Sequence, residues 1–129
     1  MTTYQGSCQC KRVRFEVDVD FATNAPTTKC NCTSCWKRRW WALPIKPDRF
    51  RAQAGAGELD TPGGFCKHCG IVPYAHVDAA DWNDGEYYSV NVAVLDGLDP
   101  ATIMAIPVRY VDGLHDTWAP LAETDRQHL

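Results

Sequence analysis

Seven cysteines in three groups restrict what this chain can fold into more than any other feature. They stand in the motifs CQC at 8–10, CNCTSC at 30–35 and CKHC at 66–69. The sequence has no apolar run of about 18 residues and no basic leader followed by an apolar stretch, so we expect a cytoplasmic protein without a membrane segment. The cytoplasm is reducing, and paired cysteines there are more often metal ligands or redox centres than structural disulfides.

Two of the cysteine groups have the form of zinc half-sites. A structural zinc takes four ligands in a tetrahedron, with Zn–S distances of about 2.3 Å. In CKHCG the chain must reverse between the cysteines, and Gly70 can adopt the positive φ that suits the exit from such a turn. CQC is less common, because residues two apart in a flat strand lie about 6.5 Å apart, so we expect a bend there after Gly6. Together the half-sites would complete one tetrahedron from Cys8, Cys10, Cys66 and Cys69.

This pairing leaves a triplet of Cys30, Cys32 and Cys35. Three protein ligands with an open fourth position are typical of a reactive zinc, where water or substrate fills the vacancy. The spacing is also compatible with other arrangements. A cysteine of the CQC motif could complete the triplet, or the triplet could be structural, with a fourth ligand from an Asp or from His68, His76 or His115. Thiolates also suit iron, so the spacing does not choose the metal.

The rest of the chain is patterned mainly for β-strands. KRVRFEVDVD at 11–20 alternates apolar with charged residues, and YYSVNVAVL at 87–95 repeats the alternation, which predicts strands with one face in the core. Shorter apolar runs occur in WWALPI and IVPYAHV. Turn motifs separate these segments: AGAG at 54–57, TPGG at 61–64, NDG at 83–85, and DG at 96–97 and 112–113.

One short helix is predicted to begin near Asp99, with Pro100 at its first position and ATIMA following. A chain of 129 residues fits one domain with its own core. We therefore expect a mainly β domain over residues 1–118 with at most one or two short helices. Residues 119–129 are polar and are expected to form a tail.

The charge pattern argues against a nucleic-acid partner, as the lack of a long apolar run does against a membrane segment. The net charge is −3, and the basic residues are scattered except for KRR at 37–39. An acidic domain without a basic face is a poor match for a phosphate backbone. We expect no nucleic-acid partner and no membrane partner.

Five motifs, in this order, resemble those of one known family: GSCQC, CNCTSC, FCKHCG, VNVAVLDGLD and VRYVDGLHDTW. This is the glutathione-dependent formaldehyde-activating enzyme family, also called the GFA or centromere protein V family, which has an Mss4-like fold. The resemblance runs from about residue 4 to residue 118. It implies coiled antiparallel β-sheets, a structural zinc at the four paired cysteines and a second zinc at the triplet, in the active site.

The family name implies a carbon–sulfur lyase type of reaction, in which glutathione is joined to formaldehyde to give S-hydroxymethylglutathione. Members often carry a histidine between the first two triplet cysteines, and here that residue is Asn31. The stretch WKRRWW that follows the triplet is also bulkier than the small residues expected there. These departures concern the substrate more than the zinc sites.

The residues around the triplet suggest how such chemistry would be supported. Glutathione carries two carboxylates and one ammonium, so cations directly after the triplet would help to orient it; these are Lys37, Arg38 and Arg39. Trp36 and Trp40 would form a pocket wall. His115, in the motif DGLHDTW, is the candidate general acid or base.

Two other functions are compatible with the same residues. The chain could be a zinc-stabilised module that binds a protein through a surface patch around Trp36 and Trp40. It could also be a redox protein in which Cys32 and Cys35 form a reversible disulfide. The oligomeric state does not follow from the sequence.

Overall fold

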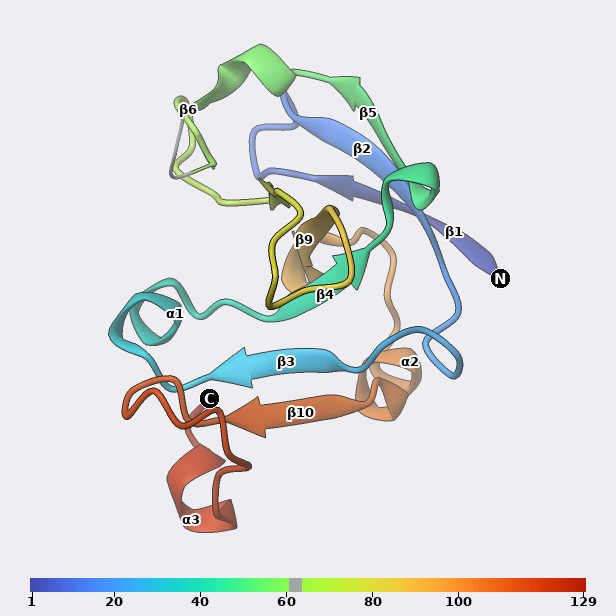
Figure 1. The fold of residues 1–129 in the computed structure, drawn as a ribbon. Coiled ribbons are helices and arrows are strands. Elements are labelled where there is room, and N and C mark those ends of the chain that lie inside the picture. The colour runs from blue at the N-terminus through green and yellow to red at the C-terminus, as the bar shows by residue number, and fades with distance from the viewer. Residues whose placement is uncertain (61–63) are drawn as a thin grey trace.

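The strands form two sheets and a short ribbon in a computed structural model that describes residues 1–60 and 64–129 (Figure 1). The first sheet is antiparallel throughout and has the order β1 (Thr2–Ser7), β2 (Arg14–Val19), β5 (Phe50–Ala54). The ribbon pairs β6 (Leu59–Asp60) with β7 (Phe65–Cys66).

The second sheet contains the strands that lead to the cysteine triplet. Its order is β10 (Val108–Val111), β3 (Thr27–Cys30), β4 (Ala42–Ile45), β9 (Tyr87–Asn91), β8 (Tyr74–Val77). β10 and β3 run parallel, and the other neighbours are antiparallel. Figure 1 shows β3 and β10 side by side and pointing the same way. Val111 lies opposite Cys30, so both strands end at the triplet.

The helical segments are all short. The α-helices are α1 (Thr33–Arg38), α2 (Pro100–Ala105) and α3 (Glu123–Arg126). Single 3₁₀ turns are η1 (Pro47–Arg49), η2 (Ala56–Glu58) and η3 (Val92–Val94). The predicted mainly β fold is confirmed, although the described residues form three short α-helices where one or two were expected. In the described part of the chain, no helix is long and apolar enough to cross a membrane.

The core lies between the two sheets and is built by alternation along β2. Phe15, Val17 and Val19 are buried, while the residues between them face outward. Phe15 packs against Phe50 and Tyr74, with ring centroids 5.4 and 5.2 Å away. Aromatic side chains from β2, β5 and β8 therefore join one sheet to the other.

Two predicted elements can be compared directly with the structure. The helix at Asp99 is confirmed, because the Asp99 carboxylate accepts a hydrogen bond from the Thr102 N–H at 2.7 Å and caps α2. The strand predicted over residues 87–95 is correct only as far as Asn91. There the Asn91 side chain accepts from the Ala93 N–H, and the chain turns into η3. Val92 and Val94 are still buried.

The segment 119–129 contains structure of its own. Pro120 bridges to Val111, the Leu121 N–H donates to the Tyr110 carbonyl, and α3 follows. The boundary at residue 118 remains a prediction. Of the turn motifs, residues 61–63 of TPGG lie outside the described part of the chain.

Candidate metal centres

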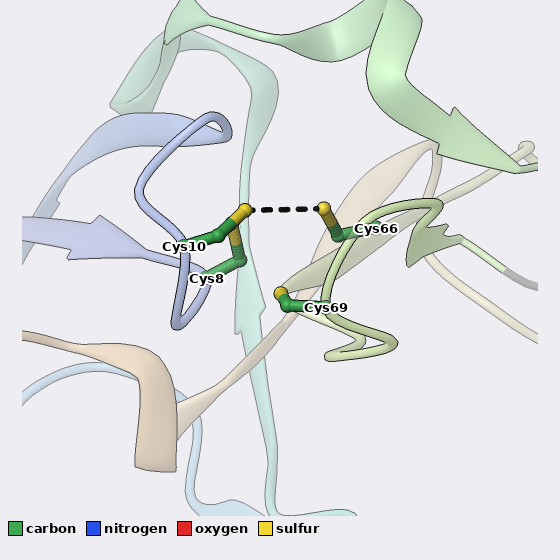
Figure 2. A group of neighbouring side chains, drawn as sticks. All are labelled: Cys8, Cys10, Cys66 and Cys69. Atoms are coloured by element: carbon green, nitrogen blue, oxygen red, sulfur yellow. Dashed lines mark hydrogen bonds between the residues drawn. The ribbon is translucent and has the colours of Figure 1, made fainter.

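Four cysteines from two distant turns meet in the first cluster. Cys8 and Cys10 follow β1, while Cys66 ends β7 and Cys69 lies in the turn after it. Figure 2 shows the side chains of Cys8 and Cys10 on one turn facing those of Cys66 and Cys69 on the other. The Sγ atoms of Cys8 and Cys10 are 3.5 Å apart, and those of Cys10 and Cys66 are 3.7 Å apart. All four sulfurs lie within 4.8 Å of one another.

These distances fit a tetrahedral metal. A Zn–S length of about 2.3 Å places the sulfurs of a tetrahedron about 3.8 Å apart. The observed separations are close to that value, and the donors are four thiols. The cluster could therefore hold a metal ion such as zinc.

Local backbone geometry explains why both turns bring their sulfurs together. After β1 the chain bends as the spacing requires, but Lys11, with φ of 63°, makes the bend rather than Gly6. Gly6 is needed for another reason, because a Cβ there would collide with the Phe15 ring. In the second turn, Gly70 has φ of 79° and donates its N–H to the Cys66 carbonyl at 2.8 Å.

The thiols of the first cluster differ in pKa. Burial raises the pKa of the Cys8 thiol to about 11. A hydrogen bond from the backbone N–H of Arg12 lowers the pKa of Cys10 to about 6, and the Arg12 side chain adds to this effect. Arg12 therefore helps to offset the negative charge that a set of thiolates would carry.

The triplet forms a second cluster where β3 meets α1. Cys30 ends β3, Cys32 is the N-cap of α1, and Cys35 lies one turn into that helix. The Cys32 N–H donates to Cys30 Sγ and the Cys35 N–H donates to Cys32 Sγ, both at 3.4 Å. The three sulfurs lie within 4.8 Å of one another, so this cluster could also hold a metal ion.

The cysteine spacing left open whether another side chain completes the triplet, and the structure can be compared with each candidate. Within residues 1–60 and 64–129, no other Cys, His, Asp or Glu donor joins the triplet. The CQC cysteines belong to the other cluster. The three candidate histidines contact carboxylates and do not join the triplet: His68 contacts Glu58, His76 contacts Glu86 and His115 contacts Asp112.

Burial and hydrogen bonding act in opposite directions on the triplet thiols. Burial raises the pKa of Cys30, and it raises the pKa of Cys35 to about 12. Burial also acts to raise the pKa of Cys32. Hydrogen bonds from the Cys35 N–H and from the neighbouring thiols outweigh it and leave the Cys32 pKa below its ordinary value.

A loop after β10 packs directly on the triplet. Gly113 approaches so closely that a Cβ there would collide with Cys30 Sγ and would lie 3.2 Å from the Trp118 ring. Asn31 holds this loop: its side-chain amide donates to Asp112 Oδ1 at 3.1 Å, and its side-chain oxygen accepts from the Leu114 N–H at 3.0 Å.

The same loop carries His115. Its Nδ1 lies 2.9 Å from an Asp112 carboxylate oxygen, and the imidazole is exposed. Partial burial acts to raise the pKa of Asp112, but hydrogen bonds from Asn31 and His115 outweigh it and lower that pKa. A carboxylate at Nδ1 favours the tautomer with its proton on Nδ1, which leaves Nε2 free to exchange a proton.

Two hollows adjoin the triplet, and Trp40 and Cys35 line both. The first hollow, with about 410 Å³ of space including its open mouth, is lined by Lys29, Cys30, Cys35, Trp36, Arg39, Trp40 and Leu129. The second hollow, of about 620 Å³, is lined by Cys35, Arg38, Trp40, Val72, Ala75, Val77, Tyr87 and Ser89.

The predicted substrate-binding residues are distributed unevenly around these hollows. Trp36, Arg39 and Trp40 line the first hollow, and Arg38 lines the second. Lys37 lines neither of them. The Trp40 indole N–H reaches Ser89 Oγ at 3.3 Å, which fixes the wall between the hollows.

Sequence reasoning missed three residues at this site. Lys29 lines the first hollow, Gly113 touches Cys30, and Asp112 contacts His115. Asp112 and Gly113 had the signature of a turn, and the structure has a turn over residues 113–116. The only further signal in the sequence was that this turn directly follows the strand VRYV.

The cysteine clusters and the fold agree with what comparison with known proteins shows. The chain belongs to the family described as glutathione-dependent formaldehyde-activating enzyme, whose model matches residues 3–111. The loop with Asp112, Gly113 and His115 follows the matched residues directly.

A solved structure is also similar to this chain. The crystal structure of a protein from Rhodobacter sphaeroides is similar to this chain, with 31% sequence identity and a TM-score of 0.60. The similarity covers 81% of this chain and 98% of that one. None of the curated proteins compared with the chain matches it.

Proposed function

We propose that this protein is a zinc-dependent carbon–sulfur lyase that joins a thiol such as glutathione to formaldehyde and splits the adduct again. The four-cysteine cluster holds a structural zinc, and the triplet holds the reactive one. One observation carries the proposal: the triplet gathers three thiols, no Cys, His, Asp or Glu from the rest of the described residues joins them, and two hollows lie beside it. Family membership supports the same reaction class.

The reaction needs a thiolate, a carbonyl carbon and a proton. Zinc bound at the triplet would supply the positive charge that keeps a substrate thiol deprotonated. The thiolate sulfur attacks the formaldehyde carbon, the C–S bond forms, and the π pair of the carbonyl moves to oxygen, which then takes a proton. Splitting the adduct reverses each of these changes.

His115 is suited to move that proton. Asp112 holds the ring through Nδ1, so Nε2 can deliver a proton to the new alkoxide oxygen or remove it in reverse. Asn31, which stands where relatives often have histidine, is used instead to hold the His115 loop against the triplet. We therefore assign the proton-transfer role to His115 rather than to residue 31 in this chain.

The walls of the hollows would select and shelter the substrate. Trp36 and Trp40 limit access of water to the reacting atoms. Arg38 and Arg39, one at each hollow, and the neighbouring Lys37 favour an anionic thiol over a neutral one.

The test is the rate at which formaldehyde exchanges with its glutathione adduct, measured by exchange NMR with ¹³C-formaldehyde and the zinc-loaded protein. We expect the protein to accelerate exchange, and His115→Gln to lose at least about tenfold of the acceleration with its metal content unchanged. His76→Gln is the matched control, because His76 is another exposed histidine paired with a carboxylate. If the unaltered protein gives no acceleration, the lyase proposal is wrong and a zinc-stabilised binding module becomes the better account.

A further inference from the structure

The second hollow has an apolar base, although this base lies on a sheet face turned away from the core. Tyr74 of β8 and Val90 of β9 are paired, and both are buried in the core. Side chains alternate between the two faces of a sheet, so the next residues of each strand point the other way. Two such pairs line the hollow: Ala75 with Ser89, and Val77 with Tyr87.

This outer face differs from that of a strand whose outer side meets solvent. In β2, the residues between the buried ones are charged, namely Glu16 and Asp18. The outer face of β8 and β9 instead carries alanine, valine and tyrosine, all partly exposed. An antiparallel sheet normally has polar residues on the face away from its core. A partly exposed apolar patch on that face therefore indicates a surface that meets a ligand.

The patch is the base of a formed hollow that reaches the triplet. Cys35 lines this hollow of about 620 Å³, and Val72 adds another apolar side chain. Trp40 separates it from the first hollow, with its indole N–H held by Ser89 Oγ, and Arg38 supplies a charged group. Small-molecule sites are typically concave and mostly apolar, with a few polar groups. A ligand in the hollow would lie against a sulfur of the triplet.

The substrates named above leave this hollow unused. Formaldehyde consists of one carbon and one oxygen with their hydrogens, which is far too small to fill the space or to contact its apolar base. Glutathione is polar and charged, so it gains little from valine and alanine side chains. The proposed reaction joins a thiol to a carbonyl carbon, and that carbon can carry an apolar chain in place of one hydrogen.

We propose that the second hollow binds the apolar chain of an aldehyde, so that the carbonyl substrates of this protein include aldehydes longer than formaldehyde. This inference rests on the proposed function and deepens it, because it names the class of carbonyl substrate. The chemistry is unchanged. The thiolate sulfur forms a bond to the aldehyde carbon, the π pair of the carbonyl moves to oxygen, and that oxygen takes a proton. The chain does not react and lies on the outer face of β8 and β9.

The first test varies the length of the aldehyde and keeps glutathione as the thiol. Exchange NMR with the zinc-loaded protein gives the aldehyde concentration at which the acceleration is half-maximal. We expect this concentration to fall about tenfold from propanal to pentanal. Pentanal adds two methylenes, and each methylene that is fully buried contributes about fourfold in affinity.

A variant that fills the hollow separates this site from general effects of chain length. Ala75 lies on the outer face of β8, so the larger side chain of Ala75→Phe should occupy the space of the aldehyde chain without entering the core. We expect this variant to lose the advantage of pentanal over propanal. Ala52→Phe is the matched control, because Ala52 is an exposed alanine of β5 in the other sheet. The control should keep the full advantage.

Binding of pentanol provides a readout that does not depend on the reaction, because pentanol has the chain but no carbonyl. We expect it to shift the amide NMR signals of residues 75–77 and 87–89 in the zinc-loaded protein and to leave those of β2 unchanged. Ala75→Phe should reduce these shifts. If pentanol leaves β8 and β9 unaffected, the apolar site is wrong.

The remaining outcomes distinguish this inference from the proposed function. If formaldehyde exchange is accelerated but aldehyde length and Ala75→Phe have no effect, the aldehyde site is wrong while the lyase proposal stands. Pentanethiol and propanethiol, each supplied with formaldehyde, test the other occupant. If the chain-length advantage appears with these thiols and not with the aldehydes, the hollow belongs to the thiol and the aldehyde assignment is wrong. If the protein accelerates exchange of no aldehyde, both proposals are wrong.

Discussion

At the scale of single residues, Gly113 shows most clearly how the chain builds the triplet site. Its backbone lies where a side chain would overlap a sulfur of the cluster, and its neighbour Asp112 orients His115. A glycine in a DG pair indicates a turn, so its second role cannot be read from the sequence. That role exists only because the parallel pairing of β3 and β10 places the turn beside Cys30.

Gly113→Ala should therefore weaken the triplet without unfolding the chain. The added Cβ would push Cys30 or Trp118 aside, and displacing a group that supports a metal ligand typically costs about 10- to 100-fold in affinity. Competition with a chromophoric chelator measures the loss. Gly57→Ala is the control, because no atom lies within 4 Å of a Cβ at that position. Equal metal affinity in the Gly113→Ala and Gly57→Ala variants would contradict the close approach of the Gly113 backbone to Cys30.

At the scale of elements, the features predicted correctly are those encoded locally. Three of these features depend only on neighbouring residues: the alternation along β2, the N-cap of α2, and the C-x-C and C-x-x-C turns of the first cluster. α1 was not predicted, because it has no buried residue and no apolar period. It begins where Cys32 accepts the Cys35 N–H, so the cysteine cluster itself sets the start of the helix.

The two clusters should differ in what they do for stability. The first joins turns 56 residues apart in the chain, whereas the triplet spans one short loop. Structural zinc binding can contribute about 10 kcal/mol, which is comparable to the whole stability of a domain. Cys66→Ser should therefore yield unfolded or insoluble protein, and Cys32→Ser should keep the fold.

Circular dichroism and thermal melting of both variants provide the comparison. Serine is nearly isosteric with cysteine, so packing changes little and the metal ligand is the main loss. A soluble Cys66→Ser protein that melts like the parent chain would contradict a structural role for the first cluster. Collapse of Cys32→Ser would show that the triplet is structural as well.

At the scale of the whole molecule, aromatic side chains pack between the two sheets and so keep the two cysteine clusters in fixed positions within one domain. Phe50 from the first sheet stacks on Tyr88 from the second, with ring centroids 3.9 Å apart, and Phe15 is fully buried beside them. The sequence predicted strands with one buried face but not which strands pair. Strand order depends on contacts between distant residues, which local patterns do not encode.

Phe15→Ala should destabilise the whole domain by about 3–5 kcal/mol, because it opens a cavity where the sheets meet. Trp82→Ala should change the free energy of unfolding by less than about 0.5 kcal/mol, since Trp82 is 69% exposed. Urea denaturation of the metal-loaded proteins measures both changes. A small effect of Phe15→Ala would mean that the sheets do not depend on this aromatic contact.

The central claim is that the chain holds one closed and one open metal site, and that the open site takes a thiol. Native mass spectrometry of protein purified without added metal, with and without glutathione, tests it most directly. We predict two zinc ions per chain, one bound glutathione when it is supplied, and a Cys32→Ser variant with one zinc and no glutathione. A chain that carries a single zinc unaffected by Cys32→Ser, or two zinc ions and no glutathione, would contradict this account.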